Sequence, residues 1–397
     1  MARLCKPSPG VESHFIGDEI LLYHTRTHRL VRLNTAAAYV WCCCEEGLED
    51  SETTARYAAT FDTDPDRARQ DIAAIITQWR AAGLVDDDEP LPASPDKHAP
   101  LELALCDPPP ETFKAAASRW YRLLDAVVCI HFDDTVLAQK ARSPFRHLET
   151  DTSIANPTTT LHVGRYPDGI TVFTAEGAVA RGLAEDALVP ELHAALLVAG
   201  YNSADSLVTV HGAAIGNGKH CILLPGDSGS GKSTLAVALA ARGWIYHTDE
   251  VSVIQADGRL KPFPLAAGLK PGSWDALAPL CPEILDLPIH RRCDGRLIRY
   301  LPPPTRLPSE HTAPSVPVSH LVFPRYEAET ETSLTPISPS EGLCQLTLSG
   351  YDMAGGLDSQ RVAALVEWIA DRPCFRLVFN ELDHALALME EFLRPDP

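Results

Sequence analysis

Apolar residues in the N-terminal part of the chain recur with two spacings, and the change of spacing predicts where strands give way to helices. Glu19–His24 and Arg29–Leu33 are short apolar runs on either side of a polar turn, as in two paired strands. Over residues 64–82 the apolar positions are three and four residues apart, which predicts one buried face of a helix. The residues of this face are Ile72, Ile75, Ile76 and Trp79.

Capping residues add two more helices between these elements. Asn34 is a suitable N-cap for a helix through Trp41, and another helix is expected to begin near Ser51. Two strands and three short helices predict a small winged-helix-like α+β domain over residues 1–88. The acidic, Pro-rich residues 89–110 are typical of a semi-extended linker.

The next hundred or so residues carry ordinary strand and helix patterns without a chemical motif. The pattern predicts a strand over residues 126–132, a hairpin over residues 161–163 and 170–173, and a helix over residues 188–199. We interpret residues 111–204 as an accessory lobe that packs on a catalytic sheet.

A phosphate-binding motif follows this lobe. A short apolar run ends at Leu224, the next residues fit G-x-x-x-x-G-K-[ST], and an Ala/Leu-rich helical pattern then runs to Arg242. Backbone N–H groups of such a loop, together with a helix N-terminus, form a site for nucleotide phosphates. The predicted nucleotide-binding residues are Gly226, Asp227, Ser228, Gly229, Ser230, Gly231, Lys232, Ser233 and Thr234.

The motif predicts ATP and Mg²⁺ as ligands. Lys232 is expected to reach the β- and γ-phosphates, and Ser233 to offer its hydroxyl to Mg²⁺. If the strand over residues 244–247 is a parallel neighbour of the P-loop strand, Asp249 and Glu250 lie at the same sheet edge. One carboxylate would then hold Mg²⁺ and the other would accept a proton. The alternative is a surface acidic pair at a turn.

Four features, specific over residues 207–254, resemble the core of the HPr kinase/phosphorylase family: His211-Gly212, the P-loop, Arg242-Gly243 and Asp249-Glu250. The resemblance implies an α/β P-loop kinase domain of HPr kinase type, which we place over residues 205–397. It implies that His211 lies near the phosphates, that Asp249 is the Mg²⁺-side acid and that Glu250 is the general-base candidate. Without the resemblance, a histidine at the end of an apolar strand is more often structural.

The chain departs from that family at two positions. Thr234 stands where the enzymes that act on HPr often carry Glu, and Glu250 replaces an Asp. These departures speak against HPr as the acceptor and against the reverse, phosphorylase reaction.

The N-terminal domain carries a second resemblance, on the Leu33-Asn34 step, Ala36, Val40-Trp41 and residues 75–85. On these residues it resembles the PqqD-like domains that bind leader segments of ribosomally made, modified peptides. The resemblance implies that a leader peptide adds as a strand beside Arg29–Leu33 and rests on the 64–82 helix. The expected peptide-binding residues are Leu30, Arg32, Arg69 and Ile76. The alternative is a domain that only packs on the catalytic part or makes oligomer contacts.

Cations outside the motif are further candidates for contact with a transferred phosphoryl group. Lys270 and Arg325 lie at turn-like positions, and an ordinary solvated role is the alternative for each. Residues 287–319 are rich in Arg and Pro, which is compatible with a lid over the ligand or with a disordered loop.

Composition limits the class of partner. The formal net charge of −19 over 397 residues argues against nucleic acid and anionic membranes. No apolar run is long enough to span a bilayer and no secretory segment is evident, so a cytoplasmic location is expected. The 11 cysteines lack paired C-x-x-C spacing, so reduced thiols are expected and a zinc site is not.

Together these observations predict an ATP-dependent kinase that phosphorylates a Ser or Thr hydroxyl of a precursor peptide held through its leader. The arrangement resembles that of lasso-peptide kinases. Two alternatives remain: a kinase of a small molecule or folded protein, and a non-catalytic binding protein regulated by ATP. A homo-oligomer is compatible with the sequence.

Overall fold

A computed structural model describes residues 4–85, 105, 112–150, 156–303, 314–352 and 357–392. The chain forms two compact units. Unit 1 comprises residues 1–99, 338–348 and 355–372, and unit 2 comprises residues 100–337, 349–354 and 373–397. Most of the predicted linker over residues 89–110 lies outside the described residues.

Unit 1 is built on a three-stranded antiparallel sheet with the order β1-β2-β3. Its strands are β1 (Val11–Ile16), β2 (Glu19–His24) and β3 (Arg29–Leu33). Three helices follow, namely α1 (Thr35–Glu46), α2 (Asp50–Thr60) and α3 (Pro65–Ala81). The Asn34 side chain accepts the Ala37 N–H at 2.8 Å, which confirms the predicted N-cap. Strand β1 is an addition to the predicted elements.

The two faces of this sheet are covered by different parts of the chain. Ile20, Leu22 and Leu33 pack with Trp41 and the buried residues of α3. Alternation along β2 turns Leu21 and Tyr23 to the other face, yet both are fully buried.

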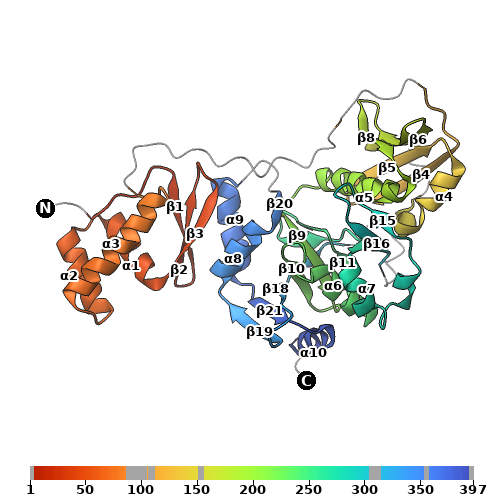
Figure 1. Cartoon of the computed structure of the whole chain (residues 1–397). Coiled ribbons are helices and arrows are strands. Elements are labelled where there is room, and N and C mark those ends of the chain that lie inside the picture. The colour runs from red at the N-terminus through yellow and green to blue at the C-terminus, as the bar shows by residue number, and fades with distance from the viewer. Residues whose placement is uncertain are drawn as a thin grey trace. The chain divides into compact units, whose positions relative to one another are not determined.

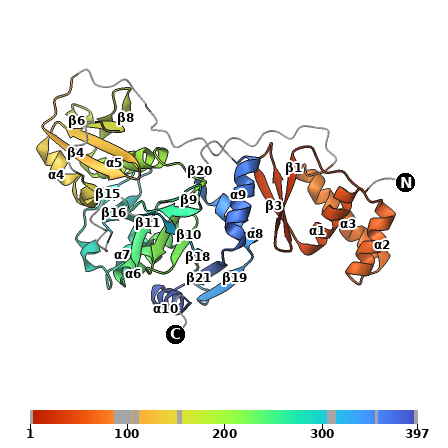
Figure 2. The ribbon, with the colours of Figure 1, turned by 180° about the vertical axis from the view of Figure 1, so that it is seen from behind.

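Helices α8 (Pro339–Leu348) and α9 (Ser359–Ala370) cover that second face. Figures 1 and 2 show these blue helices beside the orange-red sheet of unit 1 in both views. The Ser340 hydroxyl donates to Glu19 at 2.5 Å, and the Ser359 hydroxyl donates to Glu12 at 2.6 Å. The predicted division at residue 205 therefore needs a correction, because these two helices from the C-terminal part belong to the compact N-terminal unit.

Cysteine pairing also differs from the sequence-based expectation. A disulfide joins Cys5 to Cys44, which links the N-terminal segment to α1. The expectation of reduced thiols is therefore wrong at these two positions. Folding brings together residues that are far apart in the sequence, and a search for C-x-x-C spacing does not detect a pair 39 residues apart.

Unit 2 contains a ten-stranded mixed sheet whose main path runs β17-β13-β12-β9-β10-β18-β21-β19, with β11 and β20 paired to β9. Its first strands are β9 (Val208–Gly216), β10 (Cys221–Pro225), β11 (Ile245–Thr248), β12 (Val251–Ile254) and β13 (Arg259–Lys261). The others are β17 (Val316–Pro317), β18 (His320–Tyr326), β19 (Ser333–Ile337), β20 (Gly350–Asp352) and β21 (Cys374–Phe379). Helices α6 (Lys232–Ala241) and α10 (Leu382–Phe392) pack on this sheet.

The P-loop strand β10 and the strand before the acids, β11, are not parallel neighbours as the sequence suggested. Both pair antiparallel with β9, whereas the parallel partner of β10 is β18. Two strands antiparallel to the same strand run in the same direction. Their carboxyl ends therefore meet at one edge of the sheet, and the predicted proximity of loop and acids survives the change of topology.

The accessory lobe is a five-stranded sheet, β4-β5-β6-β7-β8, that shares a core with the catalytic sheet. Val251, Phe263 and Tyr300 belong to the same buried cluster as lobe residues, which confirms the predicted packing. Its strands are β4 (Ala117–Leu123), β5 (Ala126–Phe132), β6 (Thr159–Tyr166), β7 (Gly169–Phe173) and β8 (Ala178–Leu183). Its helices are α4 (Thr135–Lys140), the 3₁₀ helix η1 (Ser143–Leu148) and α5 (Glu185–Asn202).

A small sheet with the order β14-β16-β15 completes unit 2. It consists of β14 (Ala267–Leu269), β15 (His290–Arg291) and β16 (Leu297–Leu301). Helix α7 (Pro271–Leu277) and the 3₁₀ helix η2 (Pro282–Leu285) lie between β14 and β15 in the chain. The first part of the basic segment 287–319 is thus an ordered hairpin, and residues 304–313 lie outside the described part. Among the described residues, no helix is long and apolar enough to cross a membrane.

Candidate functional site

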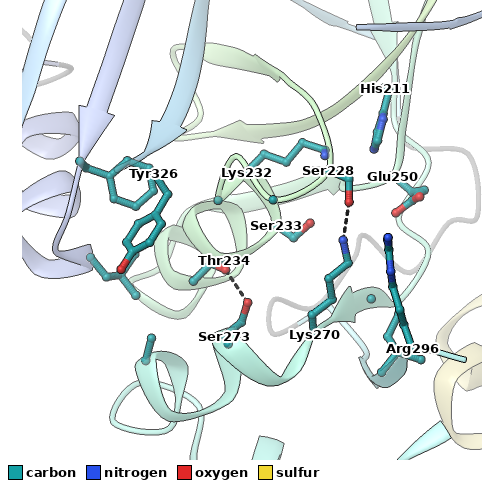
Figure 3. Close-up of a pocket in the computed structure, with 18 of the residues that line it drawn as sticks. His211, Ser228, Lys232, Ser233, Thr234, Glu250, Lys270, Ser273, Arg296 and Tyr326 are labelled. Carbon is teal, nitrogen blue, oxygen red and sulfur yellow. Dashed lines mark hydrogen bonds between the residues drawn. The ribbon is translucent and has the colours of Figure 1, made fainter. Parts of the chain in front are cut away.

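A cavity of about 540 Å³ lies over the P-loop in unit 2, within the size range of small-molecule sites. Figure 3 shows its arrangement, with Tyr326 on one side of the loop and Glu250 and Arg296 on the other. His211, Lys232 and Glu250 all line this cavity, as the sequence predicted.

The P-loop has the backbone form that an anion site requires. Gly229 and Gly231 have φ angles of 96° and 91°, which side chains rarely permit. A Cβ at Gly231 would also lie 2.5 Å from Phe379 Cζ. Glycine is therefore needed at Gly231 for both conformation and space, and α6 begins at the next residue with its N-terminus at the cavity.

Two lysines bring positive charge to the loop. The Lys232 ammonium is almost buried and donates to the Asp227 carbonyl at 3.2 Å, and the Lys270 ammonium donates to the Ser228 hydroxyl. Burial lowers the pKa of Lys232, while the nearby carboxylates of Asp249 and Glu250 oppose that shift. A bound polyphosphate would supply the negative charge that this buried ammonium needs.

His211 connects the loop to a neighbouring strand through its backbone. Its carbonyl accepts the Gly226 N–H at 3.3 Å, and its own N–H donates to the Ser349 carbonyl at 3.1 Å. Burial, with Lys232 as the next cause, lowers the pKa of the His211 imidazole. The charges of Glu250 and Asp227 oppose this shift, and the ring lines the cavity close to Glu250 (Figure 3).

The two predicted acids lie in different environments. Asp249 is 2% exposed, and burial, reinforced by the charge of Glu250, raises its pKa to about 6. Burial also opposes the charge of Glu250, but His211, His193 and Lys232 hold its pKa below the usual value. Glu250 is among the residues that line the cavity, whereas Asp249 is not.

The residues present fit a magnesium ion. Neither carboxylate oxygen of Asp249 has a hydrogen-bond partner among the described residues, and such a buried carboxylate is normally paired or bound to a metal. The Ser233 hydroxyl lies close enough to lower the Asp249 pKa in part. An Mg²⁺ ion held by Ser233, Asp249 and phosphate oxygens would satisfy both groups.

The cations at the cavity differ in part from the predicted ones. Lys270 lines it as predicted, but Arg325 does not: its side chain is 70% exposed and pairs with Glu327 at 2.5 Å. Alternation along β18 turns Arg325 away and leaves Tyr326 at the cavity. The structure therefore places Arg325 outside the cavity, apart from the other predicted catalytic residues.

The cavity's other cations are Arg292 and Arg296, from the turn between β15 and β16. Gly295, with a φ of 81°, closes that turn, and Asp294 lies 3.8 Å from each of the two guanidinium groups. Both arginines fall in the basic segment that the sequence marked as a candidate lid. Their spacing across a Cys-Asp-Gly turn was the available signal for a hairpin.

The four residues expected to bind a leader peptide do not share one surface. Leu30 and Arg32 alternate with Val31 and Leu33, so they face α8, and Arg32 lies 3.5 Å from Glu341. Ile76 is buried in the helical core on the opposite face, and Arg69 is exposed and paired with Asp66. The predicted groove therefore needs a correction.

Val31 and Ile75 are better placed, since both are half-buried apolar residues packed against the core that contains α3. At the outer edge of β3, the Arg32 backbone lies near enough to the Cys344 thiol of α8 to lower the pKa of that thiol in part. Burial raises the pKa of that thiol to about 11. The edge of β3 is therefore partly covered by α8.

Comparison with known proteins bears on unit 1. Residues 19–85 match the family model described as coenzyme PQQ synthesis protein D (PqqD), so the chain carries a PqqD-like domain near its N-terminus. No protein of curated function matches the chain.

Two solved structures each match about a fifth of the chain. "TbiB1 in Complex with the TbiA(beta) Leader Peptide" is 24% identical, and the match covers 21% of this chain and 99% of that one, with a TM-score of 0.20. "Lasso peptide synthetase B1 complexed with the leader peptide" is 18% identical, with coverages of 21% and 98% and a TM-score of 0.20.

Proposed function

We propose that this protein is an ATP- and Mg²⁺-dependent kinase that phosphorylates a Ser or Thr hydroxyl of a precursor peptide bound through its leader. The observation that carries the kinase part is a cavity lined by the P-loop and Glu250, with the buried carboxylate of Asp249 next to Glu250 in the chain and near the Ser233 hydroxyl. Phosphoryl transfer requires a phosphate cradle, a metal ligand and a proton acceptor, and these groups can supply all three.

The reaction follows from the positions of these side chains. The P-loop amides and Lys232 would bind the β- and γ-phosphates, and Lys270, Arg292 and Arg296 would neutralise charge that develops during transfer. Ser233 and Asp249 would hold Mg²⁺, which when bound would supply positive charge next to the phosphates.

The acceptor oxygen would bond to the γ-phosphorus while the bond from that phosphorus to the β–γ bridging oxygen breaks. ADP leaves with the bonding electrons, and the hydroxyl proton passes to the Glu250 carboxylate. The depressed pKa of Glu250 favours its ionised form as the acceptor of that proton at neutral pH.

The PqqD-like domain supports a peptide as the acceptor. A domain that holds a leader segment raises the local concentration of the attached core peptide at the catalytic site. Helices α8 and α9 cover one face of the sheet. We therefore place the leader on the opposite face, which packs against α1 and α3, at Val31 and Ile75. The leader would add to β3 on the side away from β2, and α8 with its Cys344 thiol would have to move aside there for full strand pairing.

The test is the intact mass of a candidate precursor peptide encoded beside this gene, after incubation with the full chain, ATP and Mg²⁺. A gain of one phosphoryl group that requires Lys232 and is lost when the leader is removed would support both parts of the proposal. ATP binding without a mass gain would contradict the peptide acceptor and favour a small molecule or folded protein. If no substitution in the P-loop reduces ATP binding, the proposal that this protein is a kinase is contradicted.

A further inference from the structure

The candidate cavity is chemically divided along its length. On one side of the P-loop its lining is charged, with His211, Glu250 and Arg296 (Figure 3). On the other side the lining is aromatic and apolar, with Tyr326, Phe379 and Leu382, and the single amide of Asn380. Phosphate binding and proton transfer require only the charged side and the loop, so the aromatic side has no role in the mechanism above.

The Tyr326 ring is exposed enough to contact a ligand in the cavity. It is 52% exposed, whereas its neighbour Phe379 is 3% exposed. The two rings meet edge to face, with centroids 5.8 Å apart and planes at 71°. Phe379 therefore supports Tyr326 from one side, and a face of the Tyr326 ring is left for a planar partner.

The position of Tyr326 is fixed relative to the phosphate loop. Its backbone N–H donates to the Ser230 carbonyl at 3.2 Å, and the following N–H, of Glu327, donates to the Phe379 carbonyl at 2.9 Å. The Phe379 ring in turn packs against Gly231. The aromatic pair is therefore hydrogen-bonded to and packed against the phosphate cradle, and it is suited to a ligand that carries a flat group beside its phosphates.

Asn380 adds a polar contact at the same end. The Thr332 hydroxyl donates to the Asn380 side-chain oxygen at 3.1 Å, which directs the amide nitrogen to serve as a donor. The ring nitrogens of a purine are hydrogen-bond acceptors in the plane of the base. An aromatic face and one in-plane donor are the two features that a base-binding site requires.

We propose that Tyr326, Phe379, Asn380 and Leu382 form a subsite for the purine base of the nucleotide, with the base stacked on Tyr326. This inference rests on the proposed function, since it assigns the ligand at one end of the same cavity. The base would occupy the aromatic side, the phosphates the P-loop, and the acceptor hydroxyl the charged side near Glu250.

The experiment compares two ligands that share phosphates and differ in the base. The affinities of ATP and inorganic tripolyphosphate, each with Mg²⁺, are measured by titration calorimetry on the full chain. For the wild type we expect ATP to bind at least about tenfold more tightly, because stacking on an aromatic ring is worth roughly that factor or more. Tyr326→Ala should weaken ATP about tenfold and leave tripolyphosphate unchanged.

Two further variants make the result specific. Tyr326→Phe keeps the ring and should keep both affinities within about twofold, and Lys232→Ala should weaken both ligands together. Thermal unfolding of each variant checks that it is folded. Unchanged ATP affinity in Tyr326→Ala, or equal loss for both ligands, would overturn the base subsite.

The outcomes also separate this inference from the proposed function. If wild-type protein binds tripolyphosphate as tightly as ATP, and Lys232→Ala weakens both, the phosphate site stands and the base subsite is overturned. If Lys232→Ala changes neither affinity, the nucleotide site itself is overturned, and the subsite with it.

Discussion

The phosphate cavity of unit 2 depends on residues that are close together in the sequence, whereas the β-sheet of unit 1 depends on residues that are far apart. The cavity is built around one contiguous segment, in which two left-handed glycines, a lysine and a helix N-terminus follow each other within a few residues. The sheet of unit 1 is completed by α8 and α9, with hydrogen-bonded pairs 321 and 347 residues apart in sequence.

This difference has a physical origin. A phosphate cradle depends on backbone conformation, which adjacent residues determine, so a local motif is sufficient to describe it. The binding surface of a half-covered sheet depends on which face another element buries, and that element can come from anywhere in the chain. Local motifs therefore reveal chemistry more directly than they reveal surfaces.

The largest expected effect comes from the contiguous motif. Lys232→Ala should reduce phosphoryl transfer by about 10² to 10³, because a preorganised charge at the phosphates is removed from a buried site. The rate is measured by mass spectrometry of the peptide product. Arg325→Ala is the matched control: it removes an exposed cation outside the cavity and should change the rate by less than about twofold. Equal losses in both variants would contradict the distinction between motif and surface cations.

Glu250→Gln tests the group assigned to accept the proton. The side chain keeps its size and loses its charge, so the transfer rate should fall about a hundredfold while ATP affinity changes little. Single-turnover rates and calorimetric ATP affinities measure the two effects separately. A variant that transfers phosphate at the wild-type rate would contradict the role of Glu250 and favour the non-catalytic alternative.

In both regions, the bounds of strands and helices were easier to predict from the sequence than which elements lie next to each other in space. Strands β2, β3 and β5 have the predicted bounds, because turn residues and apolar spacing mark them locally. The order of strands around β9 was not predictable, since two strands that run in the same direction can be adjacent or separated by a third. The conclusion about the acids was unaffected because strand direction, not adjacency, places them.

Site residues were predictable where a motif or a family resemblance named them, and less so elsewhere. Lys232 and Glu250 line the cavity as expected, but Arg325 was chosen one position away from the residue that faces it, Tyr326. Successive side chains of a strand point to opposite faces of the sheet, so an error of one position assigns a side chain to the wrong face. The same reversal separates Leu30 and Arg32 from the face that bears Val31.

Asp249→Asn should have opposite effects on activity and stability. Burial raises the folded-state pKa of Asp249 from the usual 3.8 to about 6, so between these values the folded state binds a proton that the unfolded state does not. The free energy of unfolding therefore falls as pH rises from about 4 to 6, and at pH 7 the buried charge costs about 3 kcal/mol. The variant should lose Mg²⁺-dependent transfer and unfold at higher denaturant concentration than the wild type at pH 7.

Denaturant unfolding at pH 7 and pH 4.5 measures this effect. The stability advantage of Asp249→Asn should be largest at pH 7 and should shrink at pH 4.5, where Asp249 is mostly protonated in the folded wild type. A constant difference at both pH values would mean that the substitution acts through packing and not through the buried charge.

Unit 1 yields the smallest effects and the sharpest test of the comparison. Val31→Asp places a charge on the face assigned to the leader and should weaken leader binding about tenfold, measured by fluorescence anisotropy of a labelled leader peptide. Arg32→Ala, one residue away, removes contacts to Ser338 and Glu341 on the face covered by α8. These groups are partly exposed, so the loss of stability should be about 0.5 kcal/mol and leader affinity should stay within about twofold. If Arg32→Ala weakens the leader more than Val31→Asp does, the leader lies on the α8 side, and α8 must then move away from β3 when the leader binds.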